Sequence, residues 1–564
     1  MSSDSSTPFA FYYLSNFERA LGWLFERYDG VLDATERAFI SAFGELPRAS
    51  RALLVRMLMR KGPYFRASKL AYDEIGCPLA ASAALVELGW VEPSPALTLD
   101  TLFALSTKHE LLGGFPDLSP LPAGAGRKAD WLTMLRAAHE GERTWSEWLP
   151  SVDDRVLRVT VDALCNRLRL MFFGNLHQDW SEFVLADLGL LQYETVAFEP
   201  SSRAFQRRDD VDTYLELHAC RERLDTWPGD APLAPLVAQA AAIDCGNAWL
   251  TMRREKLTFA IGQTCERRAD WDGALAAYEA SAWPGSRCRR VRVLERCAHF
   301  DAALALAVDA LRAPESDAER QQIERMLPRL RRQAGLPAAR AASRAQPIPR
   351  DCIELARPHE PYPVEYAARD HLSRADAPAY YVENALINSL FGLLCWEPVF
   401  AAIPGAFFHP FQRGPADLYA PDFRARRAAQ FDACLAQLDG TQYRDTICRH
   451  FAQKQGVQSP FVFWGALDGT LLEHALACLP AAHLRLWFER LLDDVRGNRS
   501  GLPDLVRFWP GEQRYELIEV KGPGDRLQDN QIRWLDYCLR HRMPVRVLDV
   551  RWSGNARRSD EVRA

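Results

Sequence analysis

The stretch Gly501-Leu-Pro-Asp-Leu-Val-Arg-Phe-Trp-Pro-Gly-Glu-Gln-Arg-Tyr-Glu-Leu-Ile-Glu-Val-Lys521 decides the fold of the C-terminal part of this chain. Its apolar and β-branched residues predict a strand over 505–509, a turn at Pro510-Gly511 and a second strand over 515–521. Side chains alternate along a strand, so Glu519 and Lys521 point to one side and Val520 to the other. Pairing as a hairpin brings the carboxylate of Asp504 beside Glu519.

This hairpin predicts two carboxylates and an ammonium group in one small patch. Carboxylate oxygens suit Mg²⁺ or Mn²⁺, which prefer hard oxygen ligands and keep bound waters. Lys521 can orient or activate a water, or offset charge that develops on a phosphate. Spacing alone therefore predicts metal-dependent phosphodiester cleavage. The alternative is a surface hairpin with a solvated Glu–Lys pair.

The same residues carry a resemblance to a known family. Pro503-Asp504 followed by Glu519-Val520-Lys521 resembles the PD-(D/E)xK nuclease signature. The run Glu519-Val-Lys-Gly-Pro-Gly-Asp-Arg-Leu-Gln-Asp-Asn-Gln-Ile-Arg-Trp-Leu535 resembles the VRR-NUC subgroup and is far more specific. An amphipathic helix over 526–542 and a strand over 544–550 complete the order expected for the core of that fold.

The segment 380–400 resembles the Fanconi-associated nucleases and adds a further acidic residue. Nucleases of this group use an acidic residue on the helix before the sheet as a metal ligand, and Glu383 opens such an apolar helix. The resemblance implies that Glu383, Asp504, Glu519 and the Val520 carbonyl hold the metal, with Lys521 catalytic. Glu397 is the reserve ligand. Gln531 either hydrogen-bonds toward the metal site or caps the packing of its helix.

Length and composition bound the rest of the chain. Its 564 residues imply roughly three or four domains. The net charge of −5 gives no global attraction to DNA, so contacts must come from local basic patches. Thirteen scattered cysteines without a CxxC pair indicate reduced thiols in a cytoplasmic protein, nucleoid-associated if bacterial. No signal peptide or membrane-spanning run is expected.

Residues 1–140 are expected to form a basic DNA-binding region. A helix, a break at Gly62-Pro63 and a second helix before Gly89-Trp-Val91 look like a winged-helix module. Residues 97–137 resemble a SAP motif, with a long Pro- and Gly-rich insertion over 113–126. Basic side chains here are candidates to neutralise phosphates: Arg51, Arg60, Lys61, Arg127 and Lys128.

Residues 141–204 are expected to be a mixed helical connector, followed by helical repeats over 205–336. Trp271-Asp-Gly-Ala-Leu-Ala and Phe300-Asp-Ala-Ala-Leu-Ala lie 29 residues apart and resemble tetratricopeptide-type hairpins. Arginine forks in such an array can bind a terminal phosphate, or can be ordinary exposed helix charges. The candidates are Arg253, Arg254, Lys256, Arg287, Arg289 and Arg290.

A linker is predicted over 337–372 and the nuclease domain over 373–564, with a helical insertion over 405–480. Arg496 and Arg499 lie directly before the Pro-Asp strand and are candidates to hold the strand that is cut. The predicted fold class is multidomain and mainly α: a winged-helix/SAP-like N-terminus, helical repeats and a C-terminal α/β PD-(D/E)xK domain.

This domain order resembles a bacterial-type member of the Fanconi-associated nuclease family. The resemblance implies a structure-selective endonuclease that cuts near 5′ flaps, with 5′ exonuclease-like activity and a role in interstrand crosslink repair. Branched or flap DNA is the expected partner, with a homodimer on DNA as a further expectation. Two alternatives stay open: a four-way-junction resolvase, and a non-enzymatic repeat scaffold that carries a degenerate nuclease domain.

Overall fold

The computed structural model describes residues 11–115, 126–180, 191–229, 231–337, 347–358 and 360–553. The chain forms two compact units, one of residues 1–191 and 199–211 and the other of residues 192–198 and 212–564. Among the described residues, no helix is long and apolar enough to cross a membrane. The mainly α, multidomain expectation is confirmed.

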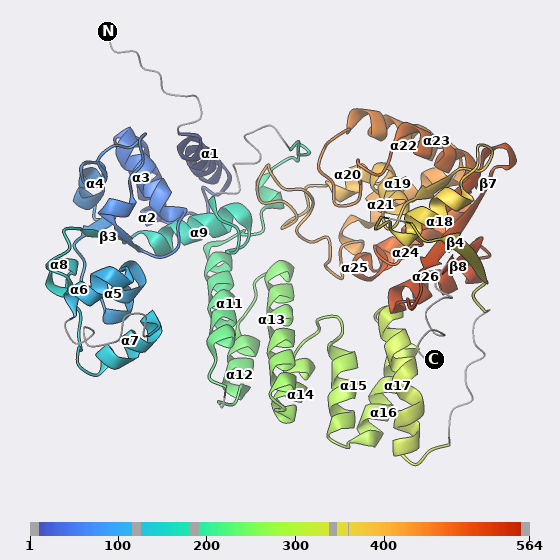
Figure 1. Cartoon of the computed structure of the whole chain (residues 1–564), viewed down its shortest axis with the longest axis horizontal. Coiled ribbons are helices and arrows are strands. Elements are labelled where there is room, and N and C mark those ends of the chain that lie inside the picture. Colours follow the sequence, from blue (N-terminus) through green and yellow to red (C-terminus); the bar gives the residue numbers. More distant parts are fainter. Residues whose placement is uncertain are drawn as a thin grey trace, which may run out of the picture. The chain divides into compact units, whose positions relative to one another are not determined.

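The first unit begins with helices packed on a small sheet (Figure 1). Residues 12–45 form two helices, because Asp33 ends the intervening turn and caps the second helix in a capping box with Glu36. The four helices are α1 (Tyr12–Arg27), α2 (Ala34–Glu45), α3 (Arg48–Leu58) and α4 (Pro78–Glu87). The helix–break–helix order expected of a winged-helix module is present.

Strands of one small sheet precede and follow the SAP-like segment in the sequence. Its antiparallel strands lie in the order β1-β3-β2, with bounds β1 (Tyr64–Arg66), β2 (Val91–Pro93) and β3 (Val156–Val159). The SAP-like helices lie between β2 and β3 in the sequence: α5 (Leu99–Leu105), α6 (Lys108–Gly114), α7 (Lys128–Arg136) and α8 (Trp145–Trp148). Both ends of the SAP-like segment are therefore held by one sheet. Most of the insertion expected over 113–126 lies outside the described residues.

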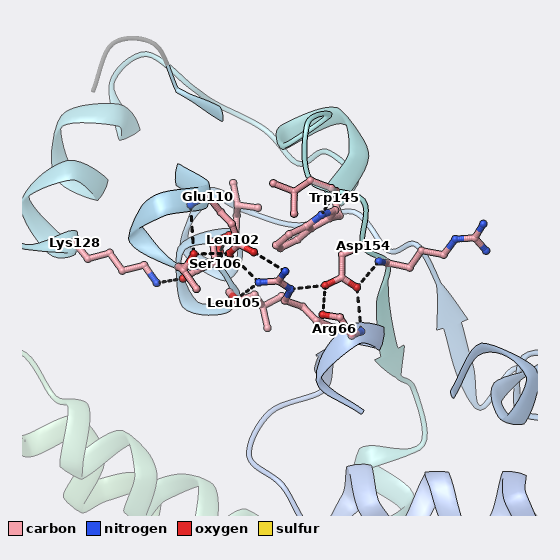
Figure 2. A network of polar contacts seen from close by, with 12 residues as sticks. Arg66, Leu102, Leu105, Ser106, Glu110, Lys128, Trp145 and Asp154 are labelled. Carbon is pink, nitrogen blue, oxygen red and sulfur yellow. Dashed lines mark hydrogen bonds and ion pairs between the residues drawn. The ribbon is translucent and has the colours of Figure 1, made fainter. Parts of the chain in front are cut away.

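A buried arginine joins the sheet to the SAP-like segment (Figure 2). Arg66 Nε donates to Asp154 Oδ2 at 2.7 Å, and its two terminal nitrogens donate to the Glu110 carboxylate at 2.9 and 2.7 Å. Its guanidinium carbon lies 4.5 Å from the centre of the Trp145 ring. Arg66 lowers the pKa of Glu110 to about 2 through these bonds. Every charge in this cluster therefore has an opposite charge in contact.

The second unit begins with helical pairs. Trp271 and Phe300, which predicted the repeat, are the first residues of α14 and α16. Each follows a turn with a positive-φ alanine two residues earlier, Ala269 and Ala298. The helices are α11 (Arg208–Thr226, which starts in the first unit), α12 (Ala234–Ala242), α13 (Ala248–Arg267), α14 (Trp271–Glu279), α15 (Ser286–Arg296), α16 (Phe300–Arg312) and α17 (Asp317–Gln333).

A five-stranded mixed sheet forms the core of the nuclease region. Its strand order is β4-β8-β7-β6-β5, with β4, β8 and β7 parallel and β6 antiparallel to both β7 and β5. The strands are β4 (Arg350–Ala356), β5 (Ala379–Tyr381), β6 (Leu505–Trp509), β7 (Arg514–Lys521) and β8 (Val545–Ser553). The predicted hairpin is thus β6–β7, and the helix predicted after it is α26 (Asp529–Arg540).

Residues 347–372 differ from the expected linker. They contain β4 and the helix α18 (Val364–Leu372), which packs against the sheet face that carries Val520. The alternating exposure along β4 reflects its place at the sheet edge, where few of its side chains are buried. This polar edge strand carries too weak an apolar pattern to be separated from a linker by sequence alone.

The opposite sheet face is covered by the larger apolar core of this unit. Its helices come from the apolar segment after β5, from the insertion and from the segment before β6. They are α19 (Leu386–Leu394), α20 (Trp396–Val399), α21 (Ala428–Ala436), α22 (Gln442–Gln453), α23 (Gly469–Cys478), α24 (Ala481–Asp493) and α25 (Val495–Asn498), and α26 adds Trp534, Leu535 and Cys538. The two sheet faces are therefore buried, while one end of the central strands stays polar.

Candidate metal centre

Strand directions bring the candidate ligands together at one end of the strands β5, β6 and β7. β5 and β7 end at the same edge at which the antiparallel β6 begins. Asp504 precedes β6, Glu519 and Lys521 end β7, and Glu383 follows β5. The register places Leu505 opposite Ile518 and Tyr381. Residues from three separate stretches therefore meet because of strand order.

Asp504, Glu519 and Lys521 form the centre of this cluster. The backbone N–H of Val520 donates to Asp504 Oδ2 at 2.8 Å. Lys521 Nζ lies 2.7 Å from Glu519 Oε1 as an ion pair. Glu519 is completely buried, with Asp504 6% and Lys521 8% exposed. The hairpin thus brings the two acids and the lysine together, as the sequence predicts.

Burial and mutual repulsion make this pair of acids electrostatically unfavourable. Burial, with the repulsion of Asp504, raises the pKa of Glu519 to about 8 although Lys521 opposes the shift. Burial also raises the pKa of Asp504 to about 6, against the Val520 hydrogen bond and the Lys521 charge. Two negative charges share the positive charge of one lysine, so the cluster favours additional positive charge.

The donor set fits a hard divalent cation. Both carboxylate oxygens of Glu519 are buried and accept no hydrogen bond of normal geometry, even with Lys521 close by. Oxygen atoms in this state match the ligand preference of Mg²⁺ or Mn²⁺. Among the described residues, no three acidic, histidine or cysteine side chains already form a closed ligand group.

Glu383 lies beside the pair but not on a helix. It occupies the turn between β5 and α19, three residues before the helix begins, which corrects its expected place at a helix start. A positive φ of 51° at Asn384 delays the helix. Glu383 Oε2 accepts the Tyr381 hydroxyl at 2.6 Å, while its charge raises the pKa of Asp504 and of Glu519. The Val382 N–H donates to the Asp504 carbonyl and ties this turn to β6.

A fourth acid near the centre escaped the sequence reasoning. Glu365, in the first turn of α18, contributes to the raised pKa of Asp504. It was missed because α18 falls within the expected linker. Glu397 instead accepts a hydrogen bond from the buried His450 at 2.8 Å, within α20 and α22. Of the two acids weighed for the third position, Glu383 is the one whose charge acts on the pair.

Gln531 caps a helix in this structure. Its side-chain oxygen accepts the backbone N–H of Gln528 at 2.8 Å, three residues earlier, in a capping box at the start of α26. This contact corresponds to the packing alternative of the two roles predicted for it.

Arg496 and Arg499 lie on α25 and at its end, just before Asp504. The Arg496 guanidinium carbon lies 5.4 Å from the Tyr419 ring centre and 5.5 Å from that of Trp283. Arg499 donates to the Tyr419 hydroxyl and to the Pro460 carbonyl. Lys256 Nζ lies 5.8 Å from the same Trp283 ring, and the charge of Arg496 helps burial to lower its pKa. We call Lys256, Arg496 and Trp283 the Trp283 cluster.

The other basic candidates of the repeats are engaged within the protein. Arg253 stacks on Tyr214 and Trp249 at 4.5 and 4.3 Å. The rest form ion pairs with nearby acids: Arg254 with Glu255, Arg287 with Glu319, Arg289 with Glu266, and Arg290 with Glu279. These four arginines therefore match the alternative of helix charges, although an ion pair can exchange partners with a phosphate.

The basic candidates of the first unit are also partly engaged. Arg51 pairs with Glu18, Arg60 donates to the Lys69 carbonyl at 3.1 Å, and Lys128 donates to the Ser106 carbonyl at 2.5 Å. Lys61 and Arg127 are exposed, and Arg127 stands at the N-cap of α7. The latter two side chains are the more accessible basic groups of this set.

The fold and the acidic centre define a metal-dependent nuclease of the PD-(D/E)xK type. Residues 439–552 match the VRR-NUC domain, residues 11–92 the FAN1, HTH domain, and residues 96–148 the Fanconi anemia-associated nuclease SAP domain. The VRR-NUC match implies dependence on a divalent metal ion. The chain belongs to the Fanconi-associated nuclease family, as its similarity to known relatives shows.

A Fanconi-associated nuclease 1 homolog from Pseudomonas aeruginosa is 54% identical over 97% of this chain and 96% of its own length. The homolog from Arabidopsis thaliana is 24% identical over 96% of this chain and 67% of its own length. Crystal structures of paFAN1 bound to 2nt and to 1nt 5′ flap DNA with gap superpose with TM-scores of 0.88 and 0.86. Both are 54% identical, covering 97% and 96% of this chain and 99% of each solved chain.

Proposed function

We propose that this chain is a structure-selective, divalent-metal-dependent endonuclease that cuts DNA near 5′ flaps in interstrand crosslink repair, with 5′ exonuclease-like activity. The observation that carries the chemistry is the buried Asp504–Glu519 pair with Lys521 at the edge of the sheet. The substrate class is supported by a relative that was solved with 5′ flap DNA. This relative is 54% identical to the chain, and the match covers nearly the whole length of both.

The metal is Mg²⁺ or Mn²⁺, held by Glu383, Asp504, Glu519 and the carbonyl of Val520. When bound, such an ion polarises the scissile phosphate and lowers the pKa of a coordinated water. Asp504 is oriented for this role because the Val520 N–H holds one of its oxygens at 2.8 Å and leaves the other for a cation. Glu383, which accepts the Tyr381 hydroxyl at 2.6 Å, would supply the third carboxylate.

Lys521 acts on the reacting groups directly. Its ammonium contacts Glu519 at 2.7 Å. With a metal ion bound at the carboxylates, the Nζ–H groups of Lys521 would hold the attacking water or stabilise the charge on the phosphate oxygens. Because Lys521 ends β7, its backbone is fixed by the ladder to β8 while its side chain can turn. Gln531 stays a candidate for a supporting hydrogen bond through the start of α26.

DNA is held by basic side chains of both units. The Trp283 cluster has two cations beside one aromatic ring and repulsion between them, which suits a phosphate such as the 5′ terminal one. Arg499 holds the strand that is cut. Further phosphate contacts come from Arg253, Arg254, Arg287, Arg289 and Arg290 and, in the first unit, from Arg51, Arg60, Lys61, Arg127 and Lys128.

Each region of the chain has its own role in this proposal. Residues 1–140 bind DNA, residues 141–204 connect, residues 205–336 form the repeats, and residues 373–564 form the nuclease domain with its insertion over 405–480. β4 and α18 extend this domain toward residue 347. We place the protein in the cytoplasm at the nucleoid, with a homodimer on DNA as a further possibility for the assembly.

Cleavage of matched substrates tests this function. The purified chain is given 5′ flap, four-way-junction and plain duplex DNA of shared sequence, with Mg²⁺, Mn²⁺ or EDTA. Preferential cutting near the flap with either metal is expected, and none with EDTA. Preference for the four-way junction would instead identify a resolvase. Absence of nicking with both metals would identify a scaffold with a degenerate nuclease domain.

A further inference from the structure

Three tyrosines lead outward from the candidate metal centre. Tyr381 donates its hydroxyl to Glu383 Oε2 at 2.6 Å. The ring centre of Tyr366 lies 5.0 Å from that of Tyr381, and the ring centre of Tyr362 lies 6.0 Å from that of Tyr366. We call Tyr381, Tyr366 and Tyr362 the tyrosine ladder. Its inner end touches a proposed metal ligand.

The ladder lies at the same sheet edge as the acids. Tyr381 ends β5, and Tyr366 lies in the first turn of α18. The start of α18 lies against the end of β7, because Val364 Cγ1 is 3.5 Å from where a Cβ on Gly522 would stand. Gly522 follows Lys521 directly. The ladder therefore starts beside the reacting groups, includes Tyr366 at the start of α18 and ends at the surface with Tyr362, just before that helix.

The outer ring is exposed and yet held in place. Tyr362 is 43% exposed. Its hydroxyl donates to Asp370 Oδ2 at 2.7 Å, and Arg369 Nε donates to the other oxygen of that carboxylate at 2.8 Å. The Arg369 guanidinium also lies 4.7 Å from the Tyr366 ring centre. Anchoring an exposed ring limits the side-chain entropy that a partner must freeze on binding.

Such exposure is unusual in this region. Across the described residues from 347 to 553, the exposed large apolar side chains are Tyr362 and Tyr419. The Tyr419 ring contacts Arg496 and Arg499, the candidates to hold the DNA strand that is cut. Tyr362 is the outer end of the ladder that begins next to Glu383. Ala368, Leu372, Val364 and Tyr381 belong to the core between α18 and the sheet, but Tyr362 does not, so packing of that core does not account for the anchored outer ring.

We propose that the tyrosine ladder is a stacking site for an unpaired base next to the scissile phosphate. The inference rests on the proposed flap cleavage and adds a reason for its selectivity. Aromatic side chains stack on any base that is free of its own duplex neighbours. Bases within a continuous duplex stay stacked on each other and do not reach Tyr362. Substrates with unpaired bases at the cut therefore gain a contact that plain duplex lacks.

Binding measured with an inert ion isolates this contact from cleavage. Fluorescence anisotropy with Ca²⁺ gives the affinity of the full chain for 5′ flap DNA and for a series in which one base at a time near the junction is replaced by an abasic site. Tyr362→Ala is expected to weaken binding about fivefold to tenfold, the weak end of aromatic–base stacking. At one position of the series the loss is expected to vanish, because the base that stacks is already missing.

Matched variants separate stacking from other effects. Tyr362→Phe keeps the ring and is expected to bind within about twofold of the wild type. Leu336→Ala, at a residue of the repeats that is 45% exposed, is the control for loss of an exposed apolar side chain. An equal loss for Tyr362→Ala on every abasic substrate, or no loss on the intact flap, would overturn the stacking site. Failure of the wild type to cleave flaps would refute the proposed function instead, since the binding series is read without cleavage.

Discussion

Two buried groups of charges in this chain are built in opposite ways. In the first unit, Arg66 contacts both Asp154 and Glu110, and the arginine and aspartate side chains are 6% and 4% exposed. In the nuclease region, Asp504 and Glu519 share Lys521, and both oxygens of Glu519 accept no hydrogen bond of normal geometry. The first group lowers the pKa of Glu110 and so favours the charged carboxylate. The second group raises the pKa of Glu519 and so disfavours the charged carboxylate.

The difference separates a structural use of buried charge from a functional one. A guanidinium that is surrounded by carboxylates completes its own bonding and fixes the SAP-like helices to the sheet. Two acids with one ammonium leave negative charge uncompensated, which destabilises the protein until a cation arrives. Raised carboxyl pKa values therefore mark the nuclease centre. In the Arg66 network the pKa of Glu110 is lowered instead, and its charges are neutralised without a ligand.

Removing an acid from the nuclease centre, where Asp504 and Glu519 share one lysine, gives the largest expected effect. Asp504→Ala is expected to lower the cleavage rate about a thousandfold or more, because a cation ligand that supplies several kcal/mol of transition-state stabilisation is lost. Binding of flap DNA should remain close to that of the wild type. Single-turnover cleavage and anisotropy measure the two. Glu354→Ala, at an exposed position of β4 in the same sheet, is the control. Surviving cleavage by purified Asp504→Ala would remove this residue from the mechanism.

Removing the arginine from the group formed by Arg66, Asp154 and Glu110 is expected to lower stability instead. Arg66→Ala leaves Asp154 and Glu110 without their partner and should lower the free energy of unfolding of the first unit by about 3–5 kcal/mol. Urea unfolding followed by tryptophan fluorescence measures it, since Trp145 packs on Arg66. Arg136→Ala, from an exposed pair with Asp100, is the control. A change below about 1 kcal/mol would show that the network does not hold this unit.

Lys521→Ala takes the single ammonium from the acidic centre. The chemical step is expected to slow about a hundredfold, the lower range for a positioned proton donor or acceptor. Binding of Mn²⁺, measured by calorimetry, should stay near that of the wild type because the carboxylates remain. A wild-type single-turnover rate would contradict the role given to Lys521, and a complete loss of Mn²⁺ binding would make it a structural partner of Glu519.

The two groups also predict opposite responses to pH. Glu110 has its pKa lowered to about 2, so its contribution to stability is present above about pH 4.5 and is lost as pH falls toward 2. Asp504 and Glu519 have pKa values raised to about 6 and 8, so stability is greatest below about pH 4 and is lost as pH rises to 8.

Without metal, hydrogen exchange of β6 and β7, corrected for the intrinsic rates, should show a stability loss of several kcal/mol between pH 5 and 8. Mg²⁺ should restore protection at pH 8, while α6 should not change between these two values. Equal protection of β6 and β7 at both pH values would refute the electrostatic account of this centre.

Local patterns explain which parts of the molecule could be predicted from sequence. Alternation along 515–521 and the Pro510-Gly511 turn predicted the hairpin, so Asp504, Glu519 and Lys521 were found together. Glu383 was placed on a helix because apolar residues follow it at once, whereas a left-handed Asn384 delays the helix start. Glu365 was missed because its helix packs on the sheet through only a few buried residues.

Long-range pairing accounts for most of what the sequence did not reveal. β1, β2 and β3 pair across a gap of more than sixty residues that holds the SAP-like segment, as the register of Val91 with Val159 shows. β4 joins the sheet through a parallel neighbour almost two hundred residues later. The ion pairs of Arg287, Arg289 and Arg290 follow from tertiary packing too, so the sequence could not reveal which acids these arginines contact in the folded chain.

An exposed ion pair on the same small sheet gives the smallest expected effect and sharpens the contrast with Arg66. Arg158 and Glu92 stand opposite each other on β3 and β2 at 3.3 Å, with side chains 46% and 45% exposed. Water solvates both charges, so Arg158→Ala should lower the free energy of unfolding by at most about 1 kcal/mol, and less in high salt. Urea unfolding at low and high salt measures this. A loss as large as that of Arg66→Ala would mean that position on the sheet, rather than burial of the charges, sets the strength of these pairs.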